Sequence, residues 1–448
     1  MNEGPVTKGR RFFKLAGMTA QVAGSYAKTR IKGLFQSEED AERERNAAHE
    51  LNGGRIARTL GELKGAVMKV GQMASIASDM LPKELAEALR SLQRQAPPVD
   101  FAVIARQIES ELGSAPEVLF KRFEVEPFAA ASIGQVHRAT TDDGREVVVK
   151  VQYPGVDGAV DSDLAQLKFA LKAGGFVKRA TGLVDVKQQS LDEVFAEIRA
   201  RLVEELDYCN EADNVRRFGE IHRGDAHIIV PEVVGERSSQ RVLTLTFEPG
   251  DRIEELDERG YSQEVRDRIG DNLFRALAAQ LFEHRILHAD PNPGNLAFRP
   301  NGEIVLYDFG CVKQVRPEIA AAYAKTIRCG IAEDWDGVDE ALRGLGVRNP
   351  EGPPVEPAFY KQWRDTLALP FLTGEPFDYA RATLHEDVIR LIPAAIKRMA
   401  SFQPPREIIF IDRAIAGHYG NLRRVRSRSR VLDMVQPYLD VALANAPE

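Results

Sequence analysis

The sequence has few cysteines, no long apolar run and no excess of positive charge. Its 448 residues include only Cys209, Cys311 and Cys329, with no C-x-x-C pair, which argues against a disulfide framework and a cysteine zinc site. No apolar run approaches the ~20 residues that a membrane-spanning helix needs. The net charge of −7 argues against a general nucleic-acid binder. We therefore expect a globular protein of a reducing compartment, with room for two or three domains.

The N-terminal residues depart from this acidic average. Residues 1–36 hold seven Lys/Arg and a single acid, Glu3. "GRRFFKLAGMTAQVAG" resembles a twin-arginine export signal, but Gln21 interrupts its apolar part. We favour a basic amphipathic helix that rests on an anionic membrane surface or packs on the protein, with an organellar transit peptide as the alternative. The expected location is cytoplasmic, with a peripheral membrane contact left open.

Glycine is scarce where a kinase-type phosphate loop would carry it. "PFAAASIGQVHRA", residues 127–139, reads as a strand that turns and returns as "REVVVKVQY", which is the layout of a phosphate-covering hairpin. Alanines replace the usual glycines, and alanine restricts the positive φ that glycine allows. We expect a stiff loop that favours one nucleotide pose. The predicted nucleotide contacts here are Ala129, Ala130, Ala131, Ser132 and, in the return strand, the phosphate-binding Lys150.

The stretch "LHADPNPGN" carries the strongest catalytic signal. Kinases use H-R-D-x-x-x-x-N, in which the aspartate orients the attacking hydroxyl and the asparagine holds a metal ion. Asp290 and Asn295 have the same offset here, and His288 stands two residues before Asp290. "LYDFG" follows, where Asp308 would bind the Mg²⁺ that bridges the β- and γ-phosphates. One such aspartate is weak evidence, but the ordered set indicates a nucleotide site.

Two further contacts are predicted from position in the chain. The carboxylate that orients Lys150 should come from "VEELDYCNEADN", which offers Glu204, Glu205, Asp207 and Glu211. The adenine should meet the connector after the strand "RVLTLTF", through the Thr246 carbonyl and the Glu248 amide, because Pro249 has no N–H.

These motifs together resemble the AarF/ABC1/UbiB family of atypical kinases, whose relatives include the mitochondrial ADCK kinases. "KVGQ" (Lys69–Gln72) matches its KxGQ motif, "AAASIGQVH" its alanine-rich loop and "ELDY" (Glu205–Tyr208) its ExD motif. "HADPNPGN", "DFG" and "FIDRAIAGHYGNL" are similar to its remaining motifs. The resemblance covers roughly residues 60–422, with Asn292 and Thr246 as departures from the usual residues. It selects Glu205 over Glu204 as the partner of Lys150.

The resemblance implies an α+β, protein-kinase-like bilobal fold with a helical N-terminal extension that covers the active site. We expect residues 1–54 to form a basic segment and acidic linker, 55–115 the KxGQ extension, 116–246 the small β-rich lobe and 247–448 the larger helical lobe. Lys69 and Gln72 share a helix face, and Asp207 is a candidate partner for Lys69. These three residues are the predicted regulatory set, which would block a peptide substrate.

The implied activity is Mg-dependent binding of ATP or ADP, with hydrolysis or phosphotransfer to a small-molecule or lipid acceptor in quinone or isoprenoid-lipid metabolism. No metal other than Mg²⁺ is expected. A pseudokinase that uses nucleotide occupancy to organise partners is the alternative, favoured by the blocked cleft. A third reading, a kinase for soluble metabolites, shares the H-x-D-x-x-x-x-N pattern, but such kinases lack KxGQ.

Overall fold

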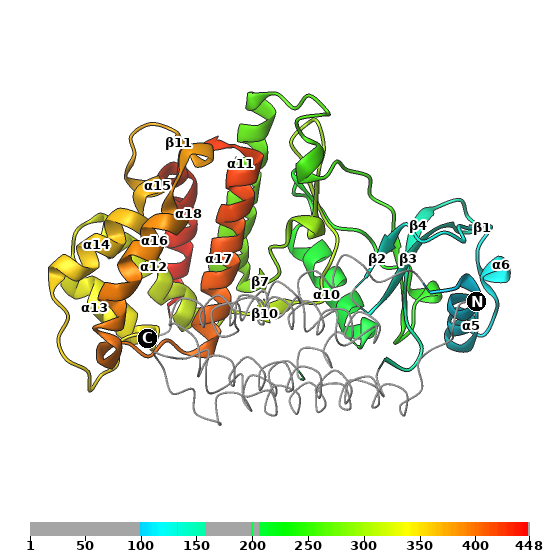
Figure 1. Cartoon of the computed structure of the whole chain (residues 1–448), viewed down its shortest axis with the longest axis horizontal. Helices are drawn as coiled ribbons and strands as arrows, with labels where there is room; N and C mark the ends of the chain where they lie inside the picture. Colours follow the sequence, from blue (N-terminus) through cyan, green and yellow to red (C-terminus); the bar gives the residue numbers. More distant parts are fainter. Residues whose placement is uncertain (1–98, 132, 157–198, 200–205, 447–448) are drawn as a thin grey trace, which may run out of the picture. The chain divides into compact units, whose positions relative to one another are not determined.

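The computed structural model describes residues 99–131, 133–156, 199 and 206–446, which Figure 1 draws in colour. The chain divides into two compact units. The first comprises residues 1–210 and 233–247, and the second comprises residues 211–232 and 248–448.

An antiparallel sheet forms the centre of the first unit. Its strand order is β1-β3-β4-β6, and β2 pairs with the beginning of β3. The hairpin predicted from "PFAAASIGQVHRA" and "REVVVKVQY" is confirmed, because β3 and β4 pair from Gly134 opposite Gln152 to Thr140 opposite Glu146. The strands span Arg122–Phe123 (β1), Ala129–Ala130 (β2), Gly134–Thr140 (β3), Glu146–Gln152 (β4) and Val242–Thr246 (β6).

Helix α5 (Phe101–Leu112) packs on this sheet and is followed by the short α6 (Pro116–Leu119). The Asp100 side chain caps α5 by accepting a hydrogen bond from the Ala102 amide (2.8 Å). Ile104 and Ile108, one turn apart on α5, are fully buried in a cluster with alternate valines of β4. Because alternate residues of a strand share a face, Lys150 lies on the face of β4 opposite these valines.

Helices make up most of the second unit. Four of them, α11 (Gln263–Ala278), α12 (Pro317–Ile331), α17 (Arg406–Val425) and α18 (Val431–Ala444), share a buried core. Helix α17 runs alongside α11 (Figure 1). The remaining described helices of the chain are α10 (Tyr208–Ile221), α13 (Trp335–Gly344), α14 (Pro357–Leu367), α15 (Leu369–Leu372) and α16 (Leu384–Ile396), with short 3₁₀ turns between elements.

Two small sheets hold the loops between α11 and α12. Strand β7 (Ile286–His288) pairs antiparallel with β10 (Val312–Gln314). Strand β8 (Leu296–Phe298) pairs antiparallel with β9 (Ile304–Leu306), which pairs in parallel with β5 (Ile228–Ile229). The loop at residues 289–295 therefore runs from β7 to β8, and the loop at residues 307–311 runs from β9 to β10, so both connect the same two sheets.

Two features of the second unit go beyond what the sequence predicted. The apolar stretch from Asn272 to Phe282 belongs to a helix that already begins at Gln263, because the Ser262 hydroxyl caps it by accepting from the Val265 amide (3.3 Å). Its continuation, Ala279–His284 (η3), is a π-helix, which a 3.6-residue periodicity does not reveal. The C-terminal region, predicted as largely helical, also contains a strand pair, β11 (Phe377–Asp378) with β12 (Arg428–Ser429). Of the helices described, none has the length and apolar character to cross a membrane.

Candidate nucleotide-binding and catalytic site

Lys150 lies in the middle of β4, between Val136 of β3 and Leu243 of β6. Its Nζ atom is 5.0 Å from the ring centroid of Tyr208, a cation–π distance. Tyr208 is almost fully buried and ends the "ELDY" motif. Of this motif, the structure therefore brings Tyr208 to Lys150, an aromatic contact that the sequence did not predict.

The alanine-rich turn is defined by backbone hydrogen bonds. Ala129 and Ala130 pair with Val136 and Gln135, and the Ala131 amide donates to the Gly134 carbonyl (3.0 Å). A Cβ atom added at Gly134 would lie 2.1 Å from the Val151 carbonyl oxygen. Glycine is therefore required where the turn enters β3, while the turn itself accommodates alanine.

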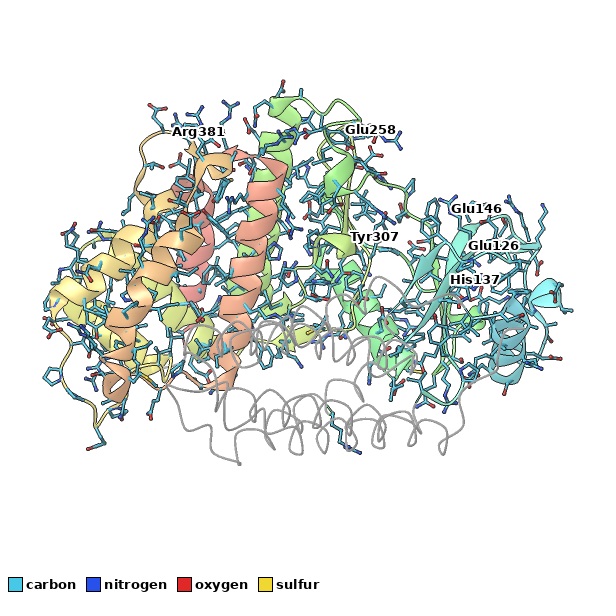
Figure 2. The ribbon with its side chains drawn as sticks, in the orientation of Figure 1. Glu126, His137, Glu146, Glu258, Tyr307 and Arg381 are labelled. Carbon is cyan, nitrogen blue, oxygen red and sulfur yellow. The ribbon has the colours of Figure 1, made fainter. Side chains whose placement is uncertain are left out.

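The connector that follows β6 contains Glu248, which is held by two residues of the second unit. The Glu248 carboxylate accepts from Nη2 of Arg299 (2.8 Å), and its carbonyl accepts from the hydroxyl of Tyr307 (2.8 Å; Tyr307 is labelled in Figure 2). Thr246 pairs with Val147 at the end of β6, as its predicted place in the strand requires. The adenine contacts of Thr246 and Glu248 stay predictions.

Asp290 and Asn295 meet, as their spacing predicts. Nδ2 of Asn295 donates to Oδ2 of Asp290 (3.0 Å) and lies 3.4 Å from the Asp290 carbonyl oxygen. Asn292 closes the turn between them by accepting from the Gly294 amide at Oδ1 (3.0 Å). The asparagine side chain is thereby oriented, with its NH₂ group donating to the aspartate.

His288 connects the Asp290 loop to the Asp308 loop. Its Nε2 atom donates a short hydrogen bond to the Asp308 carbonyl, and its backbone amide donates to Oε1 of Gln280 in the π-helix (3.0 Å). The imidazole packs edge-on against Phe309, with ring centroids 5.6 Å apart. The Asp308 carboxylate is itself oriented by the Gly310 amide, which donates to Oδ1 (2.9 Å).

The two loops are also joined by their backbones. The Tyr307 amide donates to the Asn295 carbonyl (3.0 Å), and the Ala289 amide donates to the Cys311 carbonyl (2.9 Å). Asp290, Asn295 and Asp308, separated along the sequence, are therefore held in one cluster within the second unit. This is an arrangement that could bind a divalent cation and orient an attacking oxygen.

A buried histidine on α17 belongs to the surroundings of this cluster. Neither ring nitrogen of His418 has a hydrogen-bond partner among the described residues. Burial lowers the pKa of His418 to about 4, and the nearby His288 acts in the same direction. His418 is therefore neutral at physiological pH. Apart from its place in the glycine-flanked motif "GHYGN", nothing in the sequence marks His418 as buried near the Asp290 loop.

Of the remaining predicted site residues, the structure describes only Asp207. Asp207 accepts from the Cys209 amide at Oδ1 (3.0 Å) and so caps the start of α10. Lys69, Gln72, Ser132 and Glu205 lie outside the described residues. The predicted regulatory and lysine-orienting pairs therefore stay predictions.

With this geometry in place, comparison with known proteins identifies the family. The family model described as the ABC1 atypical kinase-like domain matches residues 91–342. The chain belongs to this family. The resemblance drawn from its motifs is confirmed.

Relatives of this ABC1 chain occur in distant organisms. It is 30% identical over 437 residues to "Probable serine/threonine-protein kinase abkA" of Dictyostelium discoideum, covering 91% of this chain and 74% of that protein. It is 32% identical over 380 residues to "Atypical kinase coq-8, mitochondrial" of Caenorhabditis elegans, covering 83% of this chain and 48% of that protein. It is 37% identical over 287 residues to the chloroplastic "Protein ACTIVITY OF BC1 COMPLEX KINASE 7" of Arabidopsis thaliana, covering 63% and 39%. The chain thus spans less than half of the nematode and plant relatives.

A solved structure supports the fold. The structure titled as the complex of Rv3197 and erythromycin from Mycobacterium tuberculosis matches with a TM-score of 0.63 and 29% identity, over 89% of this chain and 97% of that one. The ABC1 chain therefore has the α+β, kinase-like fold predicted from its motifs.

Proposed function

We propose that this ABC1 chain is a magnesium-dependent, ATP-binding atypical kinase or ATPase. Lys150 holds phosphate oxygens, with Glu205 as its orienting carboxylate. Asp308 and Asn295 hold the magnesium ion, and Asp290 orients the oxygen that attacks the γ-phosphate. The alanine-rich turn, Ala129 to Ser132, covers the phosphates, and the Thr246 carbonyl and Glu248 amide contact the adenine of ATP or ADP.

The observation that carries this proposal is the set of contacts among Asp290, Asn295, His288 and Asp308. The Asn295 amide is fixed on Asp290, and His288 fixes the Asp308 backbone to the same loop. Phosphoryl transfer depends mainly on positioning and on charge stabilisation, so a pre-formed cluster of this kind is what the reaction needs.

The donor set of the second unit fits magnesium. Mg²⁺ prefers oxygen ligands and commonly takes one or two carboxylates from the protein, with phosphates and water completing its shell. Asp308 supplies a carboxylate held by the Gly310 amide, and Asn295 supplies an amide oxygen whose NH₂ group is already used by Asp290. When bound, the ion neutralises charge on the phosphates.

The acceptor is proposed to be a small molecule or a lipid, in quinone or isoprenoid-lipid metabolism. Support comes from the named relatives, which include a mitochondrial atypical kinase and a chloroplastic kinase of the BC1 complex series. In the regulatory part of the proposal, Lys69 and Gln72 cover the cleft and Lys69 pairs with Asp207, which excludes peptides. The basic residues of segment 1–36 make a peripheral contact with an anionic membrane.

Two aspartate variants test the proposal. Asp308→Asn should abolish the magnesium-dependent part of nucleotide affinity, because the carboxylate charge holds the ion. Asp290→Asn should keep that affinity and reduce single-turnover phosphate release at least ~10²-fold, the usual contribution of a general acid–base group. Isothermal titration with ATP and ADP, with and without Mg²⁺, measures the first effect, and labelled-phosphate release measures the second.

Asp336→Asn is the matched control, because Asp336 is exposed on α13. It should change neither quantity. Unchanged Mg-nucleotide affinity in Asp308→Asn would contradict the metal assignment. Tight Mg-nucleotide binding by the wild-type chain without any turnover would instead support the pseudokinase alternative.

A further inference from the structure

One side of α17 touches the Asp290 loop at two points. Asn421 is almost fully buried, and its Nδ2 atom donates to the Pro291 carbonyl (2.9 Å). One turn earlier, Gly417 lies so close to the same proline that an added Cβ would be 2.0 Å from Pro291 Cγ and 2.6 Å from its Cβ. Residues four apart lie on the same face of a helix, so both contacts come from one face of α17.

The second glycine of α17 shows that the approach at Gly417 is specific. Glycine is unfavourable in a helix interior relative to alanine. A Cβ added at Gly420 would meet nothing within 4 Å, whereas one added at Gly417 would overlap the proline ring. The close packing of Pro291 therefore requires glycine at position 417, while position 420 carries no such requirement.

The chemistry of Pro291 explains the role of Asn421. Proline has no N–H, so its backbone can be anchored at this point only through the carbonyl oxygen. Pro291 is half-buried, and the buried side-chain amide of Asn421 supplies the donor for its carbonyl. Asp290 directly precedes this anchored residue and is held from the other direction by Nδ2 of Asn295. The position of its carboxylate thus depends on both contacts.

We propose that Gly417 and Asn421 form a seat for Pro291, called the α17 seat, and that Asn421 is a positioning residue for Asp290. The proposal rests on the proposed function, in which Asp290 orients the attacking oxygen. A displacement of about 1 Å at a reacting group can reduce a rate ~10²-fold. Loss of the seat should therefore lower turnover while nucleotide affinity, which depends on other residues, is kept.

A pair of matched glycine variants tests the α17 seat in the full-length chain. Gly417→Ala should reduce kcat for ATP hydrolysis ten- to a hundredfold, with the KM for ATP changed less than threefold. Gly420→Ala adds the same methyl group to the same helix where there is room, and should leave both constants unchanged. Circular dichroism confirms that each variant is folded.

Asn421→Leu removes the donor while keeping the side chain of similar size, and should also lower kcat without raising KM. If Gly417→Ala does not fold, the Asn421→Leu variant still tests the proposal. Pro291→Gly removes the atoms that a methyl group at position 417 would strike. In the pair Gly417→Ala with Pro291→Gly, kcat should be no lower than in Pro291→Gly alone, which a general loss of stability would not produce.

The outcomes separate this proposal from the proposed function. Equal kcat in Gly417→Ala and Gly420→Ala, with an active wild type, would overturn the α17 seat and leave the proposed function intact. An increase in KM that accounts for the whole loss of activity would overturn the positioning role of Asn421. Absence of turnover in the wild type would overturn the proposed function and the α17 seat with it.

Discussion

The alanine-rich turn and the Asp290 loop are both part of the proposed phosphoryl-transfer site, yet different kinds of contact hold them in place. The turn is held by backbone pairing, Ala129 with Val136 and Ala130 with Gln135. The loop is held by side chains of other elements, Gln280 of the preceding π-helix on the amide of His288 and Asn421 of the distant α17 on the carbonyl of Pro291.

This difference determines which substitutions each segment tolerates. Backbone pairing depends little on side-chain identity, so the turn is sensitive mainly where space for the backbone is limited. Each side-chain contact of the loop can be lost separately, because replacing the side chain leaves a polar backbone group without its hydrogen-bond partner. Substitutions that affect the turn should therefore be harmful mainly at one glycine. Substitutions that affect the loop should be harmful at several residues that lie outside it.

The largest expected effect is at that glycine. Gly134→Ala would place a Cβ 2.1 Å from the Val151 carbonyl oxygen. Overpacking against backbone costs typically 1–3 kcal/mol and occasionally more, and we expect a loss of about 3 kcal/mol in the free energy of unfolding. Urea denaturation measures it. Gly219→Ala, in the open on α10, should instead gain up to about 1 kcal/mol. If the urea midpoint of Gly134→Ala equals that of the wild type, the turn can accommodate a Cβ atom at position 134.

The Gln280 anchor of the loop should come next. Gln280→Leu leaves the buried amide of His288 without its acceptor, which costs about 1–3 kcal/mol. The same denaturation experiment measures the loss, and turnover should fall because Asp290 is two residues away. Gln362→Leu, at an exposed position of α14, serves as control and should stay within about 0.5 kcal/mol of wild type. If both glutamine variants are equally stable, the loop does not depend on this side chain.

Two buried histidines, His137 of β3 and His418 of α17, also differ in their hydrogen bonding. His137, near the turn, has the Glu124 carbonyl as a partner at Nδ1 (2.9 Å), whereas the ring nitrogens of His418 have none in the described part of the chain. Burial lowers the pKa of both, that of His418 to about 4. Below pH 6.5 the unfolded state takes up the proton of His418 and the folded state does not. Folding stability is therefore lost as the pH falls toward 4.

For His418 alone, this linkage amounts to about 1 kcal/mol between pH 7 and pH 5.5. His418→Leu should remove that part of the pH dependence while leaving the contribution of His137. Unfolding free energies of both proteins, measured across this range, give the difference directly. Parallel curves would mean that the pKa of His418 is the same in the folded and unfolded states.

The smallest expected effect on stability is in the turn itself. Ala130→Gly gains access to positive φ and should cost no more than about 1 kcal/mol, since the backbone pairing with Gln135 can persist. If the alanines restrain the nucleotide pose, the ratio of ATP to ADP affinity should change several-fold, or the chain should phosphorylate itself. Titration with both nucleotides and a labelled-phosphate assay test this. An unchanged ratio without self-transfer would leave the alanines as a tight turn only.

Local signals predicted most of what the structure describes. The valine-rich stretch "VVVKVQY" predicted the strand that carries Lys150, and the offset of Asp290 and Asn295 predicted a loop in which their side chains prove to be hydrogen-bonded. The anchors of the loop could not be predicted. Asn421 lies 130 residues beyond Pro291 in sequence, and Gly417 looks the same in sequence as Gly420, although only the first meets another chain segment. Such contacts depend on tertiary packing, which periodicity and spacing do not encode.

The π-helix at Ala279–His284 has a consequence for changes in chain length. A π-helical turn contains one residue more than an α-helical turn. Deleting one residue here would let α11 continue as a regular helix and would rotate the following residues by about 100°, moving them out of phase with His288. The number of residues between α11 and His288 is therefore fixed as firmly as the identity of Gln280. Insertions and deletions that accumulate during divergence should be excluded from this segment and fall in exposed turns such as residues 373–376.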